Sequence, residues 1–334
     1  MGARNWISRL PARLLEIAAL PRWIRQLGVH AREARSAPLA PMAVHLVALL
    51  GRLDLHAGFV VDIGAGDGIA VSPTLPLFRS PAWRGLGIEP DPAKFCRLSV
   101  AFAFRDASLS LVRAKVTPAT VLDLFRACRV PERLEVLKLD IDSYDLFVLE
   151  AILAAHRPGV IVMEVNEKIP PPLYFTVLFA EDHAWSGDHF YGCSIVAAST
   201  LLRPAGYVLE SMQFDNAYFV RADLANGRVA DLPPADAFRE GYVRRPGRRR
   251  LFPHNADMDD LLEMSPEHAL EAIRDRFRAY HGRFILEREA AEGGGMSETP
   301  GGRVTSTTSN HSRGEQGSRA IRSSVSTTSR RSRE

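Results

Sequence analysis

The chain has 334 residues, 46% of them hydrophobic, so it can bury one substantial core and carry a smaller appendage. The formal net charge of +3 hides an asymmetry. Residues 1–36 carry +5 and residues 293–334 carry +4, which leaves −6 for residues 37–292. Because the positive charge lies at the two ends and not on a folded face, we expect no nucleic-acid binding.

The three cysteines, Cys96, Cys128 and Cys193, are odd in number and widely spaced. They indicate neither a disulfide framework nor a metal-binding pair, which is typical of a reducing compartment. No run of about 18 or more apolar residues is present. The stretch "LLEIAALPRWI" lacks the apolar core and cleavage site of a signal peptide. We therefore expect a cytoplasmic protein.

Residues 1–40 form a basic segment in which apolar residues recur at helical spacing, among them Trp6, Leu10, Leu14 and Ile17. This pattern predicts an amphipathic helix that docks on the body of the protein. A weak contact of this helix with a membrane surface is the alternative, since Trp and Arg both favour that interface.

From residue 41 to residue 222, short apolar runs alternate with helical patterns. The runs predict seven strands, at 59–64, 85–90, 108–114, 134–142, 159–166, 207–213 and 217–222. Helical patterns at 120–128, 145–153 and 193–202 separate several of them. This alternation predicts an α/β fold with a mostly parallel sheet and helices on both faces. The last two strands are too close in the chain for a parallel crossover, so we expect them to form an antiparallel hairpin.

The domain is followed by an extension, residues 223–292, and by a tail, residues 293–334. Residues 223–255 are rich in Pro, Gly and Arg, which predicts irregular structure. Ser265 then predicts the cap of a helix, with Pro266 at its first position. The apolar stripe of that helix comprises Leu270, Ile273, Phe277 and Phe284. The tail is low in complexity and almost free of large apolar residues, so we expect it to be disordered.

The stretch "FVVDIGAGDGIA" (59–70) runs from a strand into a turn with alternate glycines, Gly64, Gly66 and Gly68. The dinucleotide fingerprint needs G-x-G-x-x-G instead, and Ile69 stands where its third glycine would be. An NAD-dependent enzyme is therefore disfavoured. Glu89 ends the next strand, where an acid can accept hydrogen bonds from ribose hydroxyls.

The D-x-G-x-G-x-G turn followed by Glu89 resembles motif I of the class I S-adenosylmethionine (SAM)-dependent methyltransferases. The resemblance implies a Rossmann-like class I methyltransferase fold of seven strands, with SAM as cofactor. The glycines would let the backbone lie close against the methionyl part of SAM, which carries no pyrophosphate. The residues assigned to the cofactor are Asp62, Gly64, Ala65, Gly66, Asp67, Gly68, Glu89 and Asp140.

The stretch "ATVLDLFRACRVPERLEVLKLDIDSYDLFVLEAI" (119–152) is similar to the FkbM-like branch, whose strand reads L-K-I-D-V-E-G-x-E. Asp142 stands here for the Glu of that pattern and Ser143 for its Gly. The resemblance covers roughly residues 57–222. Members of this branch are mostly O-methyltransferases, so it implies methyl transfer to a hydroxyl of a small molecule or sugar.

The first strand ends at Gly64 and the fourth at Asp140, so both face the crevice beyond the carboxyl ends of the strands. Asp140 is a catalytic candidate: it could orient the acceptor, hold the SAM amino group or join a metal site with Asp142. Asp142 is either catalytic or the cap of the helix near Tyr144. We interpret Lys138 as a salt-bridge partner. No spacing of Asp and His residues is diagnostic of a metal, so we predict none.

The segment 164–194 is long for a connection, and long loops at this edge of a sheet are typical of lids. His189 is the candidate general base for the acceptor hydroxyl, whereas His183 is interpreted as an exposed loop residue. The candidate substrate contacts are Glu164, Asn166, Trp185 and Tyr191. Glu164 and Asn166 could instead only close the loop. A SAM-fold binding protein without catalysis, associated with a partner or a membrane surface, is the alternative function.

Overall fold

The computed structural model describes residues 22–103 and 108–289, which fall within one compact unit. The predicted helical pattern between Trp6 and Ile17 and the predicted disordered tail, residues 293–334, lie outside the described residues. Both remain predictions.

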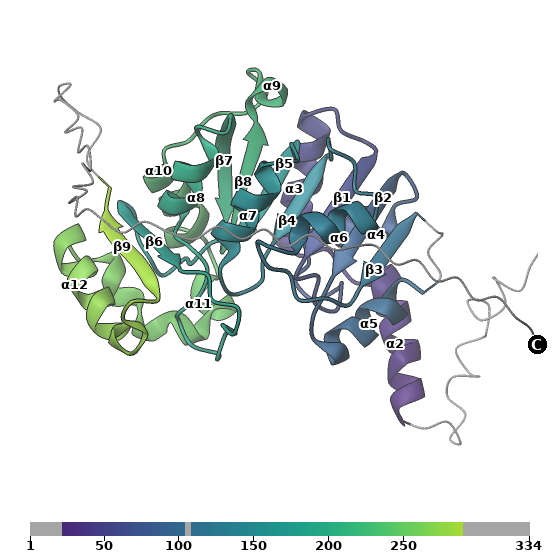
Figure 1. The fold of residues 1–334 in the computed structure, drawn as a ribbon, viewed down its shortest axis with the longest axis horizontal. Coiled ribbons are helices and arrows are strands. Elements are labelled where there is room, and N and C mark those ends of the chain that lie inside the picture. Colours follow the sequence, from purple (N-terminus) through teal and green to yellow (C-terminus); the bar gives the residue numbers. More distant parts are fainter. Residues whose placement is uncertain (1–21, 104–107, 290–334) are drawn as a thin grey trace, which may run out of the picture. The chain divides into compact units, whose positions relative to one another are not determined.

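Seven strands form the central sheet, in the order β3-β2-β1-β4-β5-β8-β7 (Figure 1). Their bounds are β1 Gly58–Ile63, β2 Trp83–Ile88, β3 Leu109–Val112, β4 Val136–Leu139, β5 Val160–Glu164, β7 Tyr207–Gln213 and β8 Asn216–Arg221. Strands β1 to β5 are parallel, whereas β8 runs antiparallel to both β5 and β7. The predicted Rossmann-like α/β fold, with a mostly parallel sheet and an antiparallel terminal hairpin, is confirmed.

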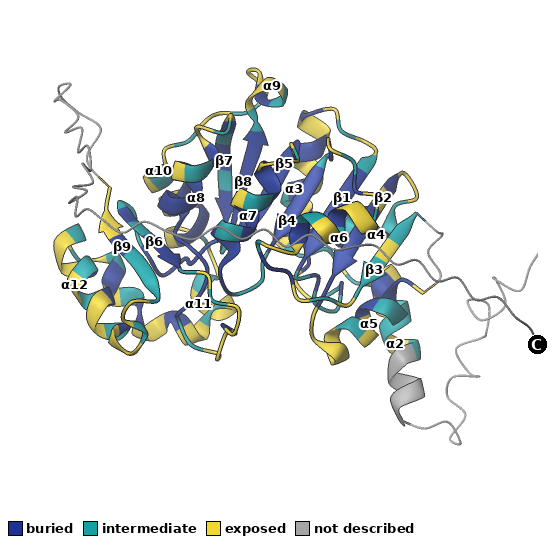
Figure 2. Cartoon of the chain, viewed as in Figure 1, coloured by how far each residue is buried: buried dark blue, intermediate teal, exposed yellow. Residues whose placement is uncertain are grey.

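Helices cover both faces of this sheet because alternate residues of the central strands point to opposite faces and both sets are apolar. One face carries α6 (Val121–Ala127), α7 (Asp145–Leu153) and α8 (Ile195–Leu202), and the other carries α3 (Pro41–Arg52), α4 (Leu75–Arg79) and α5 (Pro92–Ala101). Val61 and Ile63 of β1 belong to the first core, and Val60 belongs to the second. The central strands are therefore buried (Figure 2).

A second sheet of two antiparallel strands joins β6 (Leu173–Val177) to β9 (Phe284–Arg288). It packs with α12 (Pro266–Arg276) around a third apolar core that includes Phe175, Phe190 and Phe277. The segment predicted as a long loop therefore contains a strand. Its partner β9 lies far away in the sequence, so no local sequence pattern predicts this pairing.

The extension is more regular than predicted. Between residues 222 and 262 it forms α9 (Ala222–Ala225), α10 (Pro234–Phe238), the π-helix η3 (Arg239–Val243), α11 (Arg248–Leu251) and the 3-10 helices η4 (Pro253–Asp257) and η5 (Asp259–Leu262). Buried Phe238 and Tyr242 anchor these short turns. Ser265 caps α12 as predicted, since its hydroxyl accepts a hydrogen bond from the backbone N–H of His268. The placement of Phe284 on that helix is wrong, because the chain turns at Gly282 (φ +77°) into β9.

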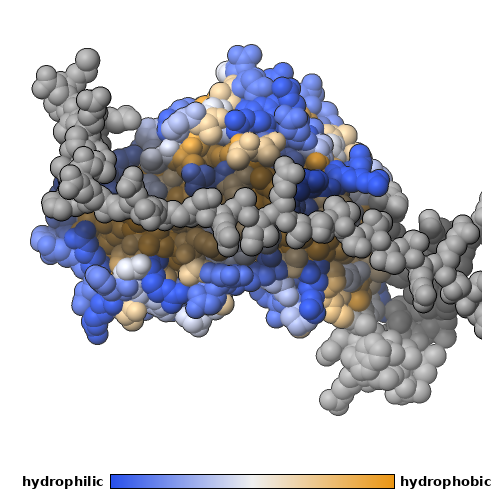
Figure 3. All heavy atoms as spheres, in the orientation of Figure 1, coloured by the Kyte–Doolittle hydropathy of each residue, from blue (hydrophilic) through white to orange (hydrophobic). Residues whose placement is uncertain are grey.

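The helix α2 (Arg22–Ser36) ends against the body of the protein. Arg79 on α4 donates to the carbonyl oxygens of Ala34 (2.5 Å) and Ala37 (2.9 Å). Among the described helices, none is by itself long and apolar enough to cross a membrane. The segments Gly28–Ser36 and Pro41–Arg52 together have the length and apolar composition of a span, but the chain bends by 44° between them. In α3, however, Leu46 and Leu49 are fully buried against the sheet. In the view of Figure 3, hydrophobic residues show along the middle and hydrophilic residues along the outer parts.

A buried carboxylate fastens α3 to β7. His45 Nε2 lies 2.9 Å from Glu210 Oε2, and Arg52 donates to Glu210 Oε1 at 2.5 Å. Ser211 donates to the same carboxylate at 2.6 Å. Burial alone would raise the pKa of Glu210, but the hydrogen bonds from these three side chains lower it to about 2.

We expect Glu210→Gln to lower the free energy of unfolding by roughly 3 kcal/mol at pH 7, since each pKa unit corresponds to about 1.4 kcal/mol. The folded pKa lies below the unfolded value of about 4.3. The stabilisation is therefore fully present above about pH 5 and is lost as the pH falls toward 2. Urea unfolding of parent and variant at pH 7 and pH 3 measures the difference, which should shrink at pH 3. An equal difference at both pH values would contradict this role of the carboxylate.

Candidate active site

The glycine turn after β1 has left-handed backbone at all three glycines, with φ of +77° at Gly64, +59° at Gly66 and +77° at Gly68. A Cβ atom at Gly64 would lie 1.6 Å from the carbonyl oxygen of Asp140, and one at Gly68 would lie 2.6 Å from Leu98. A Cβ atom at Gly66 would meet no atom within 4 Å. Packing within the protein therefore requires Gly64 and Gly68, whereas Gly66 faces open space.

No helix begins directly at this turn, because α4 starts only at Leu75. The turn is held instead by side chains. Asp67 accepts hydrogen bonds from the backbone N–H groups of Ile69 and Ala70, both at 2.9 Å, and Thr74 donates to Asp62 at 2.5 Å. A pyrophosphate at this turn would therefore lack the helix N-terminus that dinucleotide sites supply.

Glu89, which follows β2, is 4% exposed and lies beside the turn. Its Oε2 accepts from the N–H of Gly66 and its Oε1 from the N–H of Asp91, both at 2.8 Å. Each carboxylate oxygen can accept a further hydrogen bond. Glu89 is thus held in place by the backbone and still able to bind two hydroxyl groups.

Two cavities open beyond the ends of the parallel strands, and both are lined by Gly64, Glu89 and Asp142. The first has a volume of about 620 Å³ and the second about 470 Å³. Of the residues predicted to contact the cofactor, the first cavity is lined by Gly64, Ala65, Gly66, Asp67, Glu89 and Asp140. Asp62 and Gly68 line neither cavity, because Asp62 is buried beneath the turn and Gly68 packs on Leu98.

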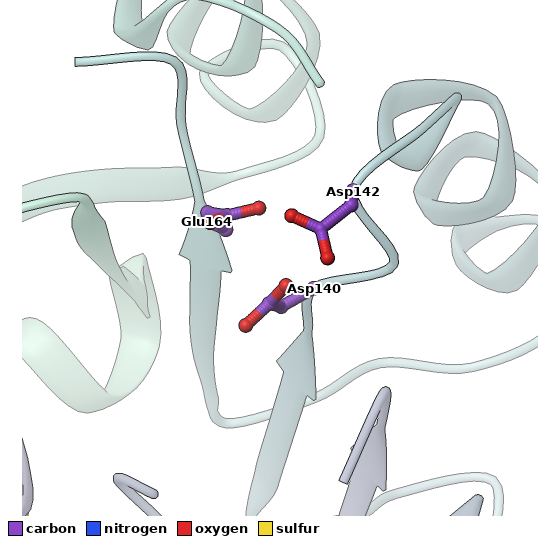
Figure 4. Close-up of side chains that lie close together, drawn as sticks. All are labelled: Asp140, Asp142 and Glu164. Atoms are coloured by element: carbon purple, nitrogen blue, oxygen red, sulfur yellow. The ribbon is translucent and has the colours of Figure 1, made fainter. Parts of the chain in front are cut away.

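Three carboxyl groups meet where β4 and β5 end (Figure 4). Asp140 follows β4, Asp142 lies in the loop after it, and Glu164 ends β5; one oxygen of each lies within 4.8 Å of the others. Lys138 pairs with Asp140 at 3.1 Å and Asp62 at 3.4 Å, which confirms its predicted role in a salt bridge. Hard divalent cations accept oxygen ligands at such spacings. The sequence suggested that Asp140 and Asp142 could share a metal site, but not that Glu164 joins them, because Glu164 comes from another strand.

The crevice carries more negative charge than its cations offset. Burial and the neighbouring Asp140 and Asp145 raise the pKa of Asp142 to about 7. Burial, followed by Asp140 and Asp142, raises the pKa of Glu164 well above its ordinary value. Burial and the charges of Glu167 and Asp140 likewise raise the pKa of Asp215 to about 7. A bound cation would relieve this repulsion.

Asp142 does not cap the helix that follows it. Asp145 instead accepts from the backbone N–H groups of Ile141 (2.8 Å) and Ser143 (3.0 Å), and α7 begins at Asp145. Asp142 adopts a left-handed backbone, with φ +54°, and its side chain faces the crevice. The capping role is therefore wrong, and the catalytic role of Asp142 stays a prediction.

The loop residues predicted to act on the substrate are separated by the fold. Asn166 closes the loop by donating to the carbonyl oxygens of His189 and Tyr191, and Tyr191 is buried with its hydroxyl donating to Glu167 at 2.7 Å. His189 Nε2 lies 3.0 Å from Asp257, in a separate hollow of about 450 Å³. None of these three lines the two cavities. The placement argues against His189 as the base, because its nitrogen faces Asp257.

Of the four predicted substrate contacts, Trp185 alone lines one of these two cavities, together with residues that were not predicted. Trp185 and His183 close the second cavity, and His183 is only 6% exposed, so its interpretation as an exposed loop residue is wrong. Asp215, Phe252 and His254 line the first cavity. Asp215 stands in the predicted hairpin turn, and this position could have identified it as a site candidate. Phe252 and His254 lie in a stretch without periodicity, so no sequence pattern predicts their place at the cavity.

No protein-family model and no curated protein matches the sequence. Similar solved structures include the N-terminal domain of EvdMO1 with SAH and D-fucose, at 13% identity over 59% of this chain and 95% of that one, with a TM-score of 0.37. A SAM-dependent methyltransferase from Clostridium acetobutylicum (9% identity, 60% and 98% covered) has a TM-score of 0.36. An O-methyltransferase from Bacillus cereus in complex with SAH (14%, 62% and 94%) has a TM-score of 0.35. At such low scores, the observed strand order and not these likenesses assigns the fold.

We expect Gly64→Ala to lower the melting temperature by roughly 10 °C or more, because its Cβ would collide with a backbone carbonyl that cannot move without shifting β4. Gly66→Ala should cost only about 1 kcal/mol, the strain of a left-handed backbone. Thermal unfolding followed by circular dichroism compares the two. Equal losses in both variants would show that the turn is not packed as described.

Proposed function

We propose that this chain is a SAM-dependent methyltransferase that transfers a methyl group to a hydroxyl oxygen of a small molecule or sugar. The observation that carries the proposal is the glycine turn joined to buried Glu89 and opening on an acidic crevice. SAM carries a positive sulfonium and an amino group, which an excess of carboxylates attracts. The same carboxylates would repel the pyrophosphate of NAD.

The residues present fit such a ligand. Gly66 leaves open space against the backbone, where a methionyl chain can lie, and Glu89 offers two acceptors to ribose hydroxyls. Asp140 lies beside the turn at the end of β4, within reach of an amino group in the first cavity. The rest of that cavity, toward Phe252 and His254, is free for an acceptor.

SAM when bound supplies an activated methyl group, so holding the acceptor in line accounts for much of the rate. The protein must also take the proton of the acceptor hydroxyl. Asp142 lines the cavity and has a pKa of about 7, raised by burial and by Asp140 and Asp145. A base with a pKa near the working pH transfers protons most effectively, so we assign this role to Asp142.

Isothermal calorimetry with SAM, SAH and NAD tests the cofactor. We expect the parent protein to bind SAM and SAH and not NAD. Turnover against a panel of hydroxylated sugars and small metabolites then separates an enzyme from a SAM-binding protein without catalysis. Binding of NAD in place of SAM would overturn the proposal.

We expect Gly66→Val to abolish SAM binding while the protein stays folded, because the new side chain enters the cavity and not the core. Gly227→Val is the matched control: Gly227 has φ +77°, no atom within 4 Å of an added Cβ, and a place outside both cavities. Both variants carry the same kind of backbone strain, so calorimetry should show loss of SAM only for Gly66→Val. An unchanged SAM affinity in folded Gly66→Val would contradict the assignment of the glycine turn to SAM binding.

We expect Asp142→Asn to lower kcat by roughly a hundredfold or more and to weaken SAM by far less, because only one of several carboxylates that attract the sulfonium is lost. In the parent, kcat/KM should rise with pH through about 7, because only the deprotonated Asp142 of the free enzyme can take the proton. That rise should be absent from the variant.

His189→Ala serves as the control variant and should retain near-parent turnover, since His189 faces Asp257. A large loss of kcat in this control would indicate that His189 is the base.

We expect turnover in EDTA to match that of the untreated protein. Activity that disappears in EDTA and returns with Mg²⁺ would assign the three carboxylates to a divalent cation.

A further inference from the structure

The second cavity is closed by a loop that the central sheet does not provide. Its floor comes from the ends of parallel strands, through Ile88 of β2 and through Val116, which follows β3. The lining also includes residues 183–185, which lie in the segment between β6 and α8. The pairing of β6 with β9 anchors the start of this loop, so the accessory sheet supports one wall of the crevice.

Side-chain contacts hold the loop over the cavity. Lys115, which follows β3, donates to the carbonyl oxygens of Glu181 and His183. The indole Nε1 of Trp185 donates to the carbonyl oxygen of Asp188 at 2.7 Å, and its ring packs edge-on against Tyr191, with the centroids 6.1 Å apart. The loop is thus tied down on both sides of Trp185.

Trp185 itself remains 45% exposed, although its contacts with Asp188 and Tyr191 hold the ring in place. Burial of so large an apolar ring in the core would raise the free energy of unfolding by a few kcal/mol. Here much of the indole surface is instead exposed to solvent at the wall of the cavity. Ile88, Pro90 and Val116, which are apolar, line the same cavity. A flat aromatic ligand would fill this space and cover the indole.

We propose that Trp185 covers the adenine ring of SAM in the second cavity. This inference rests on the proposed function and changes the predicted role of Trp185, which the sequence assigned to the acceptor. With the methionyl part at the glycine turn in the first cavity and the ribose at Glu89, the base extends into the second cavity, which shares Glu89. The acceptor then occupies the first cavity, which Trp185 does not line.

Calorimetry with SAM and with adenosine tests the inference, because adenosine lacks the methionyl part. Trp185→Ala should weaken both ligands by roughly tenfold, the usual scale of base stacking, and Trp185→Phe should restore most of the affinity. The intrinsic tryptophan fluorescence of the parent should change on addition of SAM, and this change should be absent from Trp185→Phe. Phe179→Ala is the control for loosening of the loop: Phe179 lies in the same loop with 41% exposure and contacts the cavity only through Tyr144, against which its ring packs edge-on.

The outcomes separate this inference from the proposed function. Parent-like SAM affinity in Trp185→Ala, with a raised KM for an acceptor, would place the indole at the acceptor and overturn the inference alone. Weakened SAM with unchanged adenosine would also overturn it, as would an equal loss in Phe179→Ala, which would indicate a loosened loop. A parent that binds neither ligand would overturn the proposed function, and the inference with it.

Discussion

The buried ammonium group of Lys138 is the contact on which the crevice depends. Lys138 is 4% exposed on β4, donates to the carbonyl oxygen of Gly64 at 2.7 Å, and pairs with Asp62 and Asp140. One side chain therefore fixes the glycine turn of β1 against the end of β4. Burial alone would lower its pKa, but Asp140 and Asp62 raise it, so the group stays charged. Without it, the buried carboxylate of Asp62 would keep only its hydrogen bond from Thr74, and removing one partner of a buried ion pair is strongly destabilising.

The remaining carboxylates make the crevice responsive to the charge of its ligand. Burial and neighbouring carboxylates hold the pKa values of Asp142 and Asp215 near 7, so protons offset part of the negative charge when no cation is present. A cation that enters would lower those pKa values and release protons. Under the proposed function, binding of the cationic cofactor and deprotonation of Asp142 would therefore be coupled.

The parts of the fold that could be predicted depend on local patterns. The alternating apolar runs predicted all seven strands of the central sheet. The glycine motif with Glu89 predicted Gly64, Gly66 and Glu89, which line the first cavity. The sequence could not show that Glu164 approaches Asp142, or that His189 meets Asp257, because those contacts join elements distant in the chain. The presence of neighbouring Asp and His residues in a loop does not predict the direction in which the imidazole nitrogens point. The strand β6 was missed for the same reason, since only its pairing with β9 defines it.

The pairing of β6 with β9 also sets the order in which the site can be completed. All seven strands of the central sheet have been synthesised once the chain reaches Arg221, but β9 ends only at Arg288. During translation, the sheet can therefore form before the wall that contains Trp185 has its anchor, since contacts between distant segments form late. A ribosome-bound chain that has not yet exposed β9 would hold the glycine turn and Glu89 in an open crevice. The second cavity is thus completed by a strand that is synthesised after the whole central sheet.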